Sequence, residues 1–446
     1  MKEIIYIILS IPIFFLYFSF PINHFNSKKI ITNFDISYYD TVLLNIIINL
    51  NILLFCSFFS INLHIVFFFQ LLCSLILSVF FFKKYYLYLK NNFIFLSILI
   101  VFLIVYFAKL ASNPSLTWDG LHWFYKVQSF YQGGDLQNLS SLPMNHYPYL
   151  ATYTWAFFWK NSFLELEYFG RFFYIFIYLL TLASAINCLN KNYSLLKKIL
   201  LFVFFVTITS DFYLFGGYQE YLIFCLFYLF SRLFYFFKEN KEKNLLLYLM
   251  LILIINLFLW IKQEGFFYFF ILSFIFLLHG HHSLKKNLFA IGILSLFFLI
   301  FYLIKAKFFG GINFNTKIIH DDIYSILNIK LLYSKFLFIS KYFFISFFKY
   351  PLWICILISL WLLGKRIFIK KNIFIVTFAF LTFSLVYAVY FQSATDHEFL
   401  IPVTLSRLLF GLSGFYLIVV INSLNLLKLN HETSKKLNKN NKTSNF

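Results

Sequence analysis

Long apolar runs separated by short polar segments make up almost the whole chain. At about twenty residues per membrane span, roughly four apolar helices precede residue 112 and about nine follow it. The runs lie at residues 3–20, 41–60, 62–82, 93–111, 169–190, 199–215, 221–237, 244–261, 266–279, 288–304, 351–363, 373–391 and 399–421. The pattern predicts an all-α polytopic membrane protein of about 12–13 transmembrane helices.

Three further stretches are not predicted to span the membrane. Residues 149–159 are apolar but too short to cross a bilayer, which predicts a re-entrant or juxtamembrane helix in a large outer loop. Residues 331–349 are interrupted by lysines and are expected at the surface. Residues 427–446 are basic and rich in Asn, so we expect a disordered cytoplasmic tail after one membrane domain at residues 1–426.

Composition supports this assignment. The 446 residues are 61% hydrophobic and 12% charged, with a mean hydropathy of +0.81, which excludes a soluble domain. The 69 Phe and 32 Tyr indicate an AT-rich genome, so aromatic richness says little about function. The net charge of +20 comes mostly from short loops between spans, so we expect the bilayer, and no nucleic acid, as partner. The five cysteines lie in apolar stretches without metal-ligand spacing, and we expect no disulfide.

Basic and acidic loops alternate along the chain. The basic loops are 83–90, 191–198, 238–243, 281–286, 364–371 and the tail, and the positive-inside rule makes them cytoplasmic. The opposite loops carry Asp119 with Lys126, Tyr147-Pro148, residues 217–220, residues 262–265, His320-Asp321-Asp322, and residues 396–398 with Arg407. We therefore expect a multi-pass inner (plasma) membrane protein with a polar site facing the periplasm or exterior. Three spans before residue 83 place the amino terminus outside; a terminus inside requires that one early run does not cross.

The first large outer loop contains the most concentrated polar motif. Asp119, Trp123 and Lys126 fall at i, i+4 and i+7, so a helix places them on one face. Two interpretations of this face are open: it is a functional site, or it belongs to an interfacial helix with an aromatic anchor and two solvated charges.

The position of the charges distinguishes a transporter from an enzyme that acts at the membrane surface. Transporters carry charges near the midplane, in broken helices, and often contain an internal repeat. In this chain the middles of the spans are almost free of charge, no repeat is visible, and the charges lie at the outer ends. The pattern favours chemistry at the membrane surface.

Four motifs resemble the integral-membrane GT-C glycosyltransferases, in particular the bacterial branch similar to glycosyltransferase family 39 and the related lipid A and lipopolysaccharide sugar transferases. Asp119, Trp123 and Lys126 match D-x-x-x-W-x-x-K in the first large outer loop. His146 to Leu150 is similar to a shortened H-x-x-Y-P-L element, and Gly217 to Glu220 lies where that branch has G-Y-A-D. Lys262 to Gly265 resembles K-N-E-G and, more weakly, His397 to Arg407 resembles H-x-S-x-x-x-R-L. The likeness covers residues 90–421.

The resemblance implies a transferase that moves a sugar from a polyprenyl-phosphate donor to an outer-face acceptor, which is a lipid, a saccharide or a protein. Asp119 is then the general base. The resemblance assigns the donor phosphate to Lys126, Lys262 and Arg407, and the sugar or acceptor to His122, Trp123, His146, Tyr147, Tyr218, Glu220, Glu264 and His397. It implies no cofactor, and the absence of a D-x-D motif near Asp119 leaves a divalent metal without support.

Each residue also has a structural interpretation. Asp119 can cap a helix, Lys126 can snorkel, Trp123 can anchor at the interface, and Glu220 and Glu264 can be solvated helix ends. Arg407 lies inside an apolar span, where a charge is costly without a role. The alternative function is a transporter or flippase of lipid-linked saccharide, and a third is a membrane acyltransferase or saccharide polymerase.

Overall fold

The structure is a computed structural model that describes residues 11, 14–18, 37–80, 82–116, 118–143, 145, 147–162, 165–189, 193–211, 214–239, 245–280, 284–309, 329–369, 372–392 and 397–443. Its helices are α2 (Tyr38–Phe58), α3 (Leu63–Phe80), α4 (Phe82–Ser112), α5 (Trp118–Tyr131), α6 (Leu150–Lys160), α7 (Glu167–Asn187), α8 (Leu195–Thr209), α9 (Glu220–Glu239), α10 (Leu245–Ile261), α11 (Gly265–His279), α12 (Leu284–Phe308), α15 (Ile329–Lys349), α16 (Pro351–Leu363), α17 (Ile373–Gln392) and α18 (His397–Thr443).

The predicted all-α membrane class is confirmed. No strand occurs in the part of the chain that the structure describes. Within that part, nine helices are long and apolar enough to cross a bilayer, and α10 and α11 are shorter apolar helices. The expected span at 199–215 is shorter than predicted, since α8 has 15 residues and ends at Thr209. Most of the first apolar run, 3–20, lies outside the described residues.

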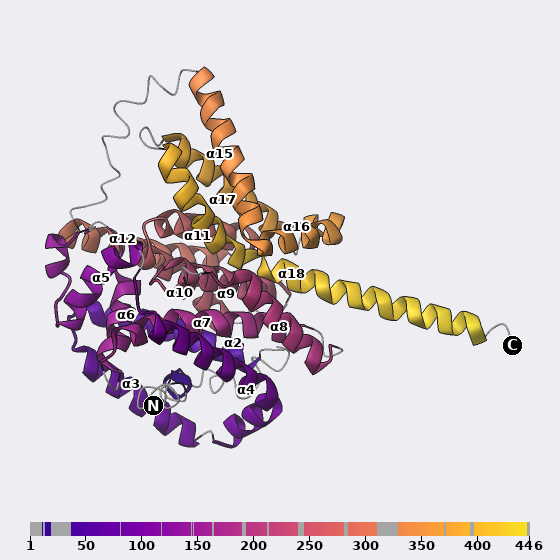
Figure 1. The fold of residues 1–446 in the computed structure, drawn as a ribbon, viewed down its shortest axis with the longest axis horizontal. Coiled ribbons are helices and arrows are strands. Elements are labelled where there is room, and N and C mark those ends of the chain that lie inside the picture. The colour runs from indigo at the N-terminus through magenta and orange to yellow at the C-terminus, as the bar shows by residue number, and fades with distance from the viewer. Residues whose placement is uncertain are drawn as a thin grey trace.

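Two expectations about polar segments are corrected. The basic loop expected at 83–90 is the first part of α4, a helix of 31 residues, because this stretch contains neither Gly nor Pro to stop a helix. The tail expected to be disordered from residue 427 continues α18 as a helix to Thr443. Figure 1 shows this part of α18 extending away from the body of the molecule.

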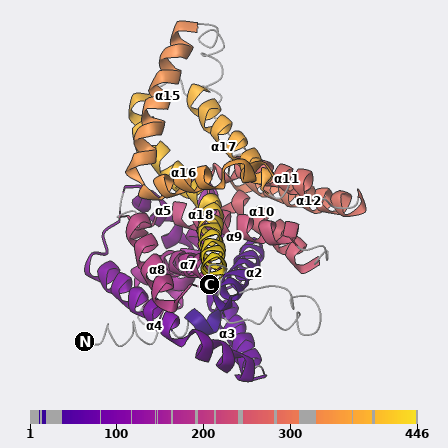
Figure 2. The same cartoon turned by 90° about the vertical axis from the view of Figure 1, so that its right-hand side faces the viewer.

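The centre of the bundle consists of α7, α9 and α18. The apolar window of α7 is completely buried, whereas only a small share of the corresponding windows of α3 and α12 is buried. Figure 2 shows α18 end-on in the middle of the molecule, with α9 beside it. The two helices pack closely because Gly414 faces α9, where an added Cβ would lie 2.1 Å from the Phe224 carbonyl oxygen. Close approach at small residues is how helices associate in lipid, where no hydrophobic force drives them together.

The loops sort into two ends of the bundle. At one end, α2 begins with buried Asp40, which accepts a hydrogen bond from Ser184 near the end of α7 and lies 3.6 Å from Arg232 of α9. The same end carries the basic stretches near residues 193–198, 238, 284–286 and 365, which adjoin the termini of α8, α9, α12 and α16. We call it the basic end.

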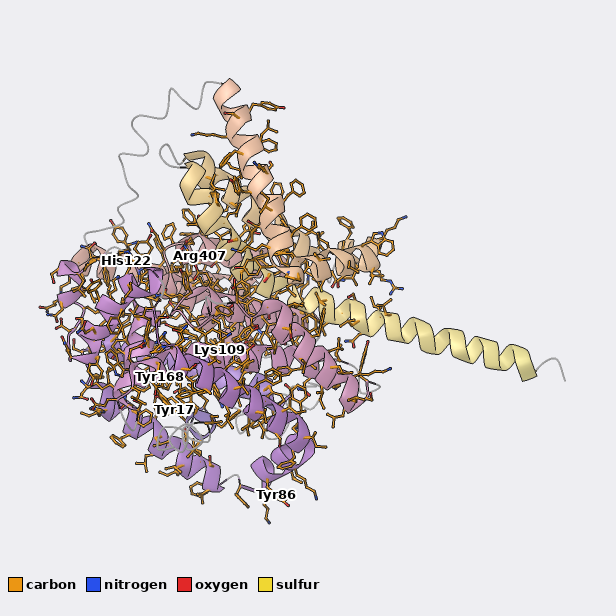
Figure 3. All side chains as sticks on the ribbon, in the orientation of Figure 1. Tyr17, Tyr86, Lys109, His122, Tyr168 and Arg407 are labelled. Atoms are coloured by element: carbon orange, nitrogen blue, oxygen red, sulfur yellow. The ribbon has the colours of Figure 1, made fainter. Side chains whose placement is uncertain are left out.

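The opposite end carries the predicted polar motifs, and we call it the motif end. Here α5 and α6 lie across the helix termini, and α6 has 11 residues, which confirms that residues 149–159 are too short to span. Beyond this end, α15 projects together with the neighbouring parts of α17 and α18 (Figure 1). Figure 3 shows the labelled His122 and Arg407 near the base of this projection and Tyr86 on the far side of the bundle.

Candidate functional site

The helix predicted for the first polar motif exists as α5, which contains Asp119, Trp123 and Lys126. Lys126 is completely buried, and its Nζ donates a hydrogen bond of 2.6 Å to the carbonyl oxygen of Tyr147. The Trp123 ring stands edge-on to the Tyr147 ring, with centroids 5.1 Å apart. The D-x-x-x-W-x-x-K motif therefore holds the loop that leads into α6, which begins two residues after Pro148.

The environment of Lys126 is unfavourable for a positive charge. Burial, and then the neighbouring ammonium of Lys305, lower the pKa of Lys126 to about 7. Lys305 is itself buried. Aromatic faces offset part of the penalty, since the Lys126 Nζ lies 5.9 Å from the ring centroid of Phe309. An anion arriving beside Lys126 would restore its charge.

A second group of predicted residues forms a buried ion cluster where α9, α18 and the α10–α11 turn meet. The Nζ of Lys262 lies 2.8 Å from Oε1 of Glu220 and 3.4 Å from Oε1 of Glu264. The Arg407 Nε lies 3.7 Å from the same Glu220 oxygen, and its guanidinium carbon lies 4.9 Å from the Tyr218 ring centroid. Five residues predicted from three separate motifs thus share one cluster.

Opposite charges balance within this cluster. Burial alone would lower the pKa of Lys262, but the carboxylates of Glu220 and Glu264 outweigh it and raise the pKa above its ordinary value. Lys262 is therefore a permanent cation, and Glu220 is shared between two cations. Lys262 and Arg407 already have carboxylate neighbours, so they are less available to a phosphate than Lys126.

Aromatic residues connect the two groups. The Lys126 Nζ faces the Phe309 ring, and that ring stacks on Tyr149 at 5.7 Å. Tyr149 in turn stands edge-on to Trp260 at 5.9 Å, two residues before Lys262. The predicted common location of these motifs is therefore observed: they meet at one end of the bundle.

Sequence reasoning missed Arg171, which holds the segment that leads to Tyr218 and Glu220. The fully buried guanidinium donates to the carbonyl oxygens of Phe215 at 2.7 Å and Pro114 at 2.7 Å, and pairs with Glu167 at 2.7 Å. It thereby joins the segment before α5 to the segment before α9. A Glu–Arg pair at i, i+4 in an otherwise apolar span is the signal that could have identified it.

Gly217 belongs to the same arrangement. Its φ of +80° is a left-handed conformation that favours glycine. A Cβ there would lie 2.7 Å from the Trp155 ring. The glycine of the G-Y-x-E motif is thus explained by close packing against α6, and its neighbours carry the polar groups.

Several predicted residues fall outside this description. His146 and the 310–328 loop with His320-Asp321-Asp322 lie outside the described residues, as do the side chains of Asp119 and His397. His122 is half-buried on α5. Among the residues that are described, no three His, Cys, Asp or Glu side chains are grouped closely enough to hold a metal ion.

Comparison of the chain with protein-family models, curated proteins and solved structures finds no match. The functional proposal therefore rests on the sequence motifs and on the geometry of the motif end.

Proposed function

We propose that this protein is a membrane glycosyltransferase of the GT-C type, which moves a sugar from a polyprenyl-phosphate donor to an acceptor at the motif end. The observation that carries the proposal is the meeting of motifs from residues 118–126, 147, 218–220, 262–264 and 407 at one end of the bundle. Because the basic loops lie at the other end, the positive-inside rule directs the motif end to the periplasm or exterior of the inner membrane.

This orientation fits the donor class. Nucleotide sugars are cytoplasmic, so a site on the outer face needs a sugar carried through the bilayer on a lipid. The phosphate of such a donor is a diester and therefore a monoanion, and we assign it to Lys126, whose Nζ contacts a carbonyl oxygen and an aromatic ring. Phosphate binding would shift Lys126 back to its charged form, so the ammonium is fully positive when the leaving group departs.

The proposed reaction is a single displacement. The acceptor hydroxyl oxygen attacks the anomeric carbon of the sugar, and Asp119 takes the hydroxyl proton as general base. The bond between the anomeric carbon and the phosphate oxygen breaks, and its electron pair leaves on the polyprenyl phosphate. That leaving group needs no proton, so one carboxylate and one cation suffice, and the sugar carbon is inverted.

The ion cluster has a different role in this proposal. Glu220 and Glu264 present carboxylate oxygens that accept hydrogen bonds from sugar hydroxyls, while Lys262 and Arg407 hold those carboxylates in place. Tyr218, facing the Arg407 guanidinium, supplies an aromatic surface at the same position.

The test is transfer of labelled sugar from polyprenyl phosphate in membranes that contain the full chain. We expect Asp119→Asn to lower the rate by about 10²–10⁴-fold, as removal of a general base does. Asp135→Asn is the matched control, since Asp135 is a carboxylate of the same large loop whose contacts are to the loop backbone. Unchanged transfer by Asp119→Asn would remove it as the base. Movement of intact lipid-linked saccharide across proteoliposomes, without bond cleavage, would replace the proposal with a flippase.

A further inference from the structure

A cavity of about 320 Å³ lies beside α3, at a distance from the ion cluster. Ligand-binding pockets measure about 300–1,000 Å³, so the cavity has the volume of a small ligand or of one hydrocarbon chain segment. Tyr17, which lines it, is labelled well away from His122 and Arg407 in Figure 3. The lining residues are Phe14, Tyr17, His64, Phe67, Phe68, Leu71, Phe158, Lys160, Asn161, Ser162, Glu165 and Phe169.

The lining is divided between an apolar interior and a polar rim. The interior is formed mainly by phenylalanine rings, among which Phe14 and Phe158 stack with centroids 4.8 Å apart. The rim is formed where α3 begins and α6 ends, and it carries His64, Lys160 and Glu165. A ligand that fits both parts has a hydrocarbon chain attached to a charged group.

The cavity opens toward the bilayer. Phe68, which lines it, is 63% exposed, and Leu72 on the next turn is 55% exposed. An exposed apolar face on a membrane-spanning helix contacts lipid, since water would not solvate it. A lipid chain can therefore enter sideways between α3 and α6.

The rim is fixed in place by hydrogen bonds and stacking. Lys160 Nζ donates to the Tyr131 carbonyl oxygen at 2.8 Å, and the Tyr131 ring stacks on Trp159 at 4.0 Å. Trp159 Nε1 donates to the Glu165 carbonyl oxygen at 2.6 Å. His64 Nδ1 bonds Asn161 Oδ1 at 2.8 Å. An ammonium has three donors and an imidazole two nitrogens, so Lys160 and His64 each retain a hydrogen-bonding position for a ligand.

We propose that this cavity binds a zwitterionic membrane phospholipid with a primary amine, of the phosphatidylethanolamine class. One acyl chain occupies the phenylalanine-lined interior. The phosphate lies at Lys160 and His64, and the headgroup ammonium lies at Glu165. The two signs of charge on the rim match the two charges of this headgroup, whereas a lipid with only a negative headgroup would place no cation beside Glu165. The proposal is independent of the sugar-transfer chemistry.

The test is native mass spectrometry of the purified full chain with phosphatidylethanolamine or phosphatidylglycerol added in detergent. Leu71→Trp fills the cavity, and Leu72→Trp adds the same ring to the lipid-facing side of the same helix as the matched control. We expect Leu71→Trp to lose one tightly bound phosphatidylethanolamine that the wild type and Leu72→Trp retain. Equal retention by both variants would overturn the proposal.

The headgroup assignment is tested on the rim with substitutions that remove a charge and keep a polar side chain. Glu165→Gln should weaken phosphatidylethanolamine binding at least fivefold and leave phosphatidylglycerol binding unchanged. Lys160→Gln should weaken both lipids. If the wild type binds the two lipids equally well and Glu165→Gln changes neither, the rim does not select the headgroup and the assignment is wrong.

Discussion

Glu220 is the residue on which the ion cluster depends, because its carboxylate lies beside both Lys262 and Arg407. Glu220→Gln would remove the carboxylate that Lys262 and Arg407 share and leave only half-buried Glu264 beside Lys262. Removing one partner of a buried ion pair costs about 3–5 kcal/mol. We expect that loss in the free energy of unfolding, measured by detergent denaturation. In the double variant Glu220→Gln with Lys262→Met, part of the loss should be recovered; additive losses would show that the two groups do not interact.

Burial of Lys126 makes the free energy of unfolding depend on pH. Folding lowers the pKa of Lys126 from 10.5 to about 7, so the unfolded chain binds more protons between these values and the free energy of unfolding rises with pH across that window. Lys126→Met abolishes the titration. Its melting temperature relative to the wild type should therefore fall as pH rises from 7 to 10. Lys109→Met, at an exposed position, is the control, and the same slope in both variants would contradict the assignment.

The residues of the cluster could be predicted, but their pairing could not. Arg407 was identified by the cost of a charge inside an apolar span, and Glu220 and Lys262 by the loop motifs that contain them. Which carboxylate each cation contacts depends on how helices far apart in sequence cross. For Arg171 the sequence shows only the pairing with Glu167, because its other partners are the backbone carbonyls of Pro114 and Phe215, and carbonyls leave no signal in a sequence.

At the scale of elements, glycine sets how closely helices approach at the motif end. Gly265 begins α11, and a Cβ there would lie 1.8 Å from the Phe258 carbonyl oxygen of α10. The glycine of the K-Q-E-G motif thus allows the short turn that carries Lys262 and Glu264. The same sequence pattern therefore encodes both a close helix crossing and the charges placed on it.

Substitution of two helical glycines should give opposite results. Gly265→Ala forces α10 and α11 apart, and overpacking of this kind costs about 1–3 kcal/mol. Gly292→Ala meets nothing within 4 Å in α12, and replacing Gly inside a helix by Ala gains about 0.5–1 kcal/mol. Melting temperatures in detergent should fall for the first and rise slightly for the second. Equal shifts would indicate that the α10–α11 crossing is not close.

The elements themselves were more predictable than their ends. Apolar runs identified the long helices, because a helix satisfies its backbone hydrogen bonds within one segment in lipid. Their boundaries depend on breakers rather than on polarity. Lys83 and Lys90 are polar but do not stop α4, and the basic residues after 427 do not stop α18.

At the scale of the whole molecule, the bundle separates two kinds of loop. The ion cluster and Lys126 lie at the motif end, and the basic stretches lie at the other end with Asp40 and Arg232. The direction of α2 follows from this arrangement, because Asp40 at its start lies at the basic end while Ser57 near its finish bonds the hydroxyl of Tyr149. The chain therefore reaches α2 from the basic end, which the sequence left open.

This polarity predicts which loops a membrane-impermeant thiol reagent reaches. Asn138 lies in the large loop after α5 and Lys365 in the turn after α16, at opposite ends of the bundle. In a variant with the five native cysteines replaced, Asn138→Cys should be labelled in intact cells, or in spheroplasts if an outer membrane blocks the reagent. Lys365→Cys should be labelled only after the membrane is permeabilised, because basic loops remain in the cytoplasm. Labelling of Lys365→Cys alone from outside would place the motif end in the cytoplasm, where nucleotide sugars are present and a lipid-carried donor would not be required. Labelling of both from outside would mean that the two loops share one face of the membrane, which contradicts the bundle described here.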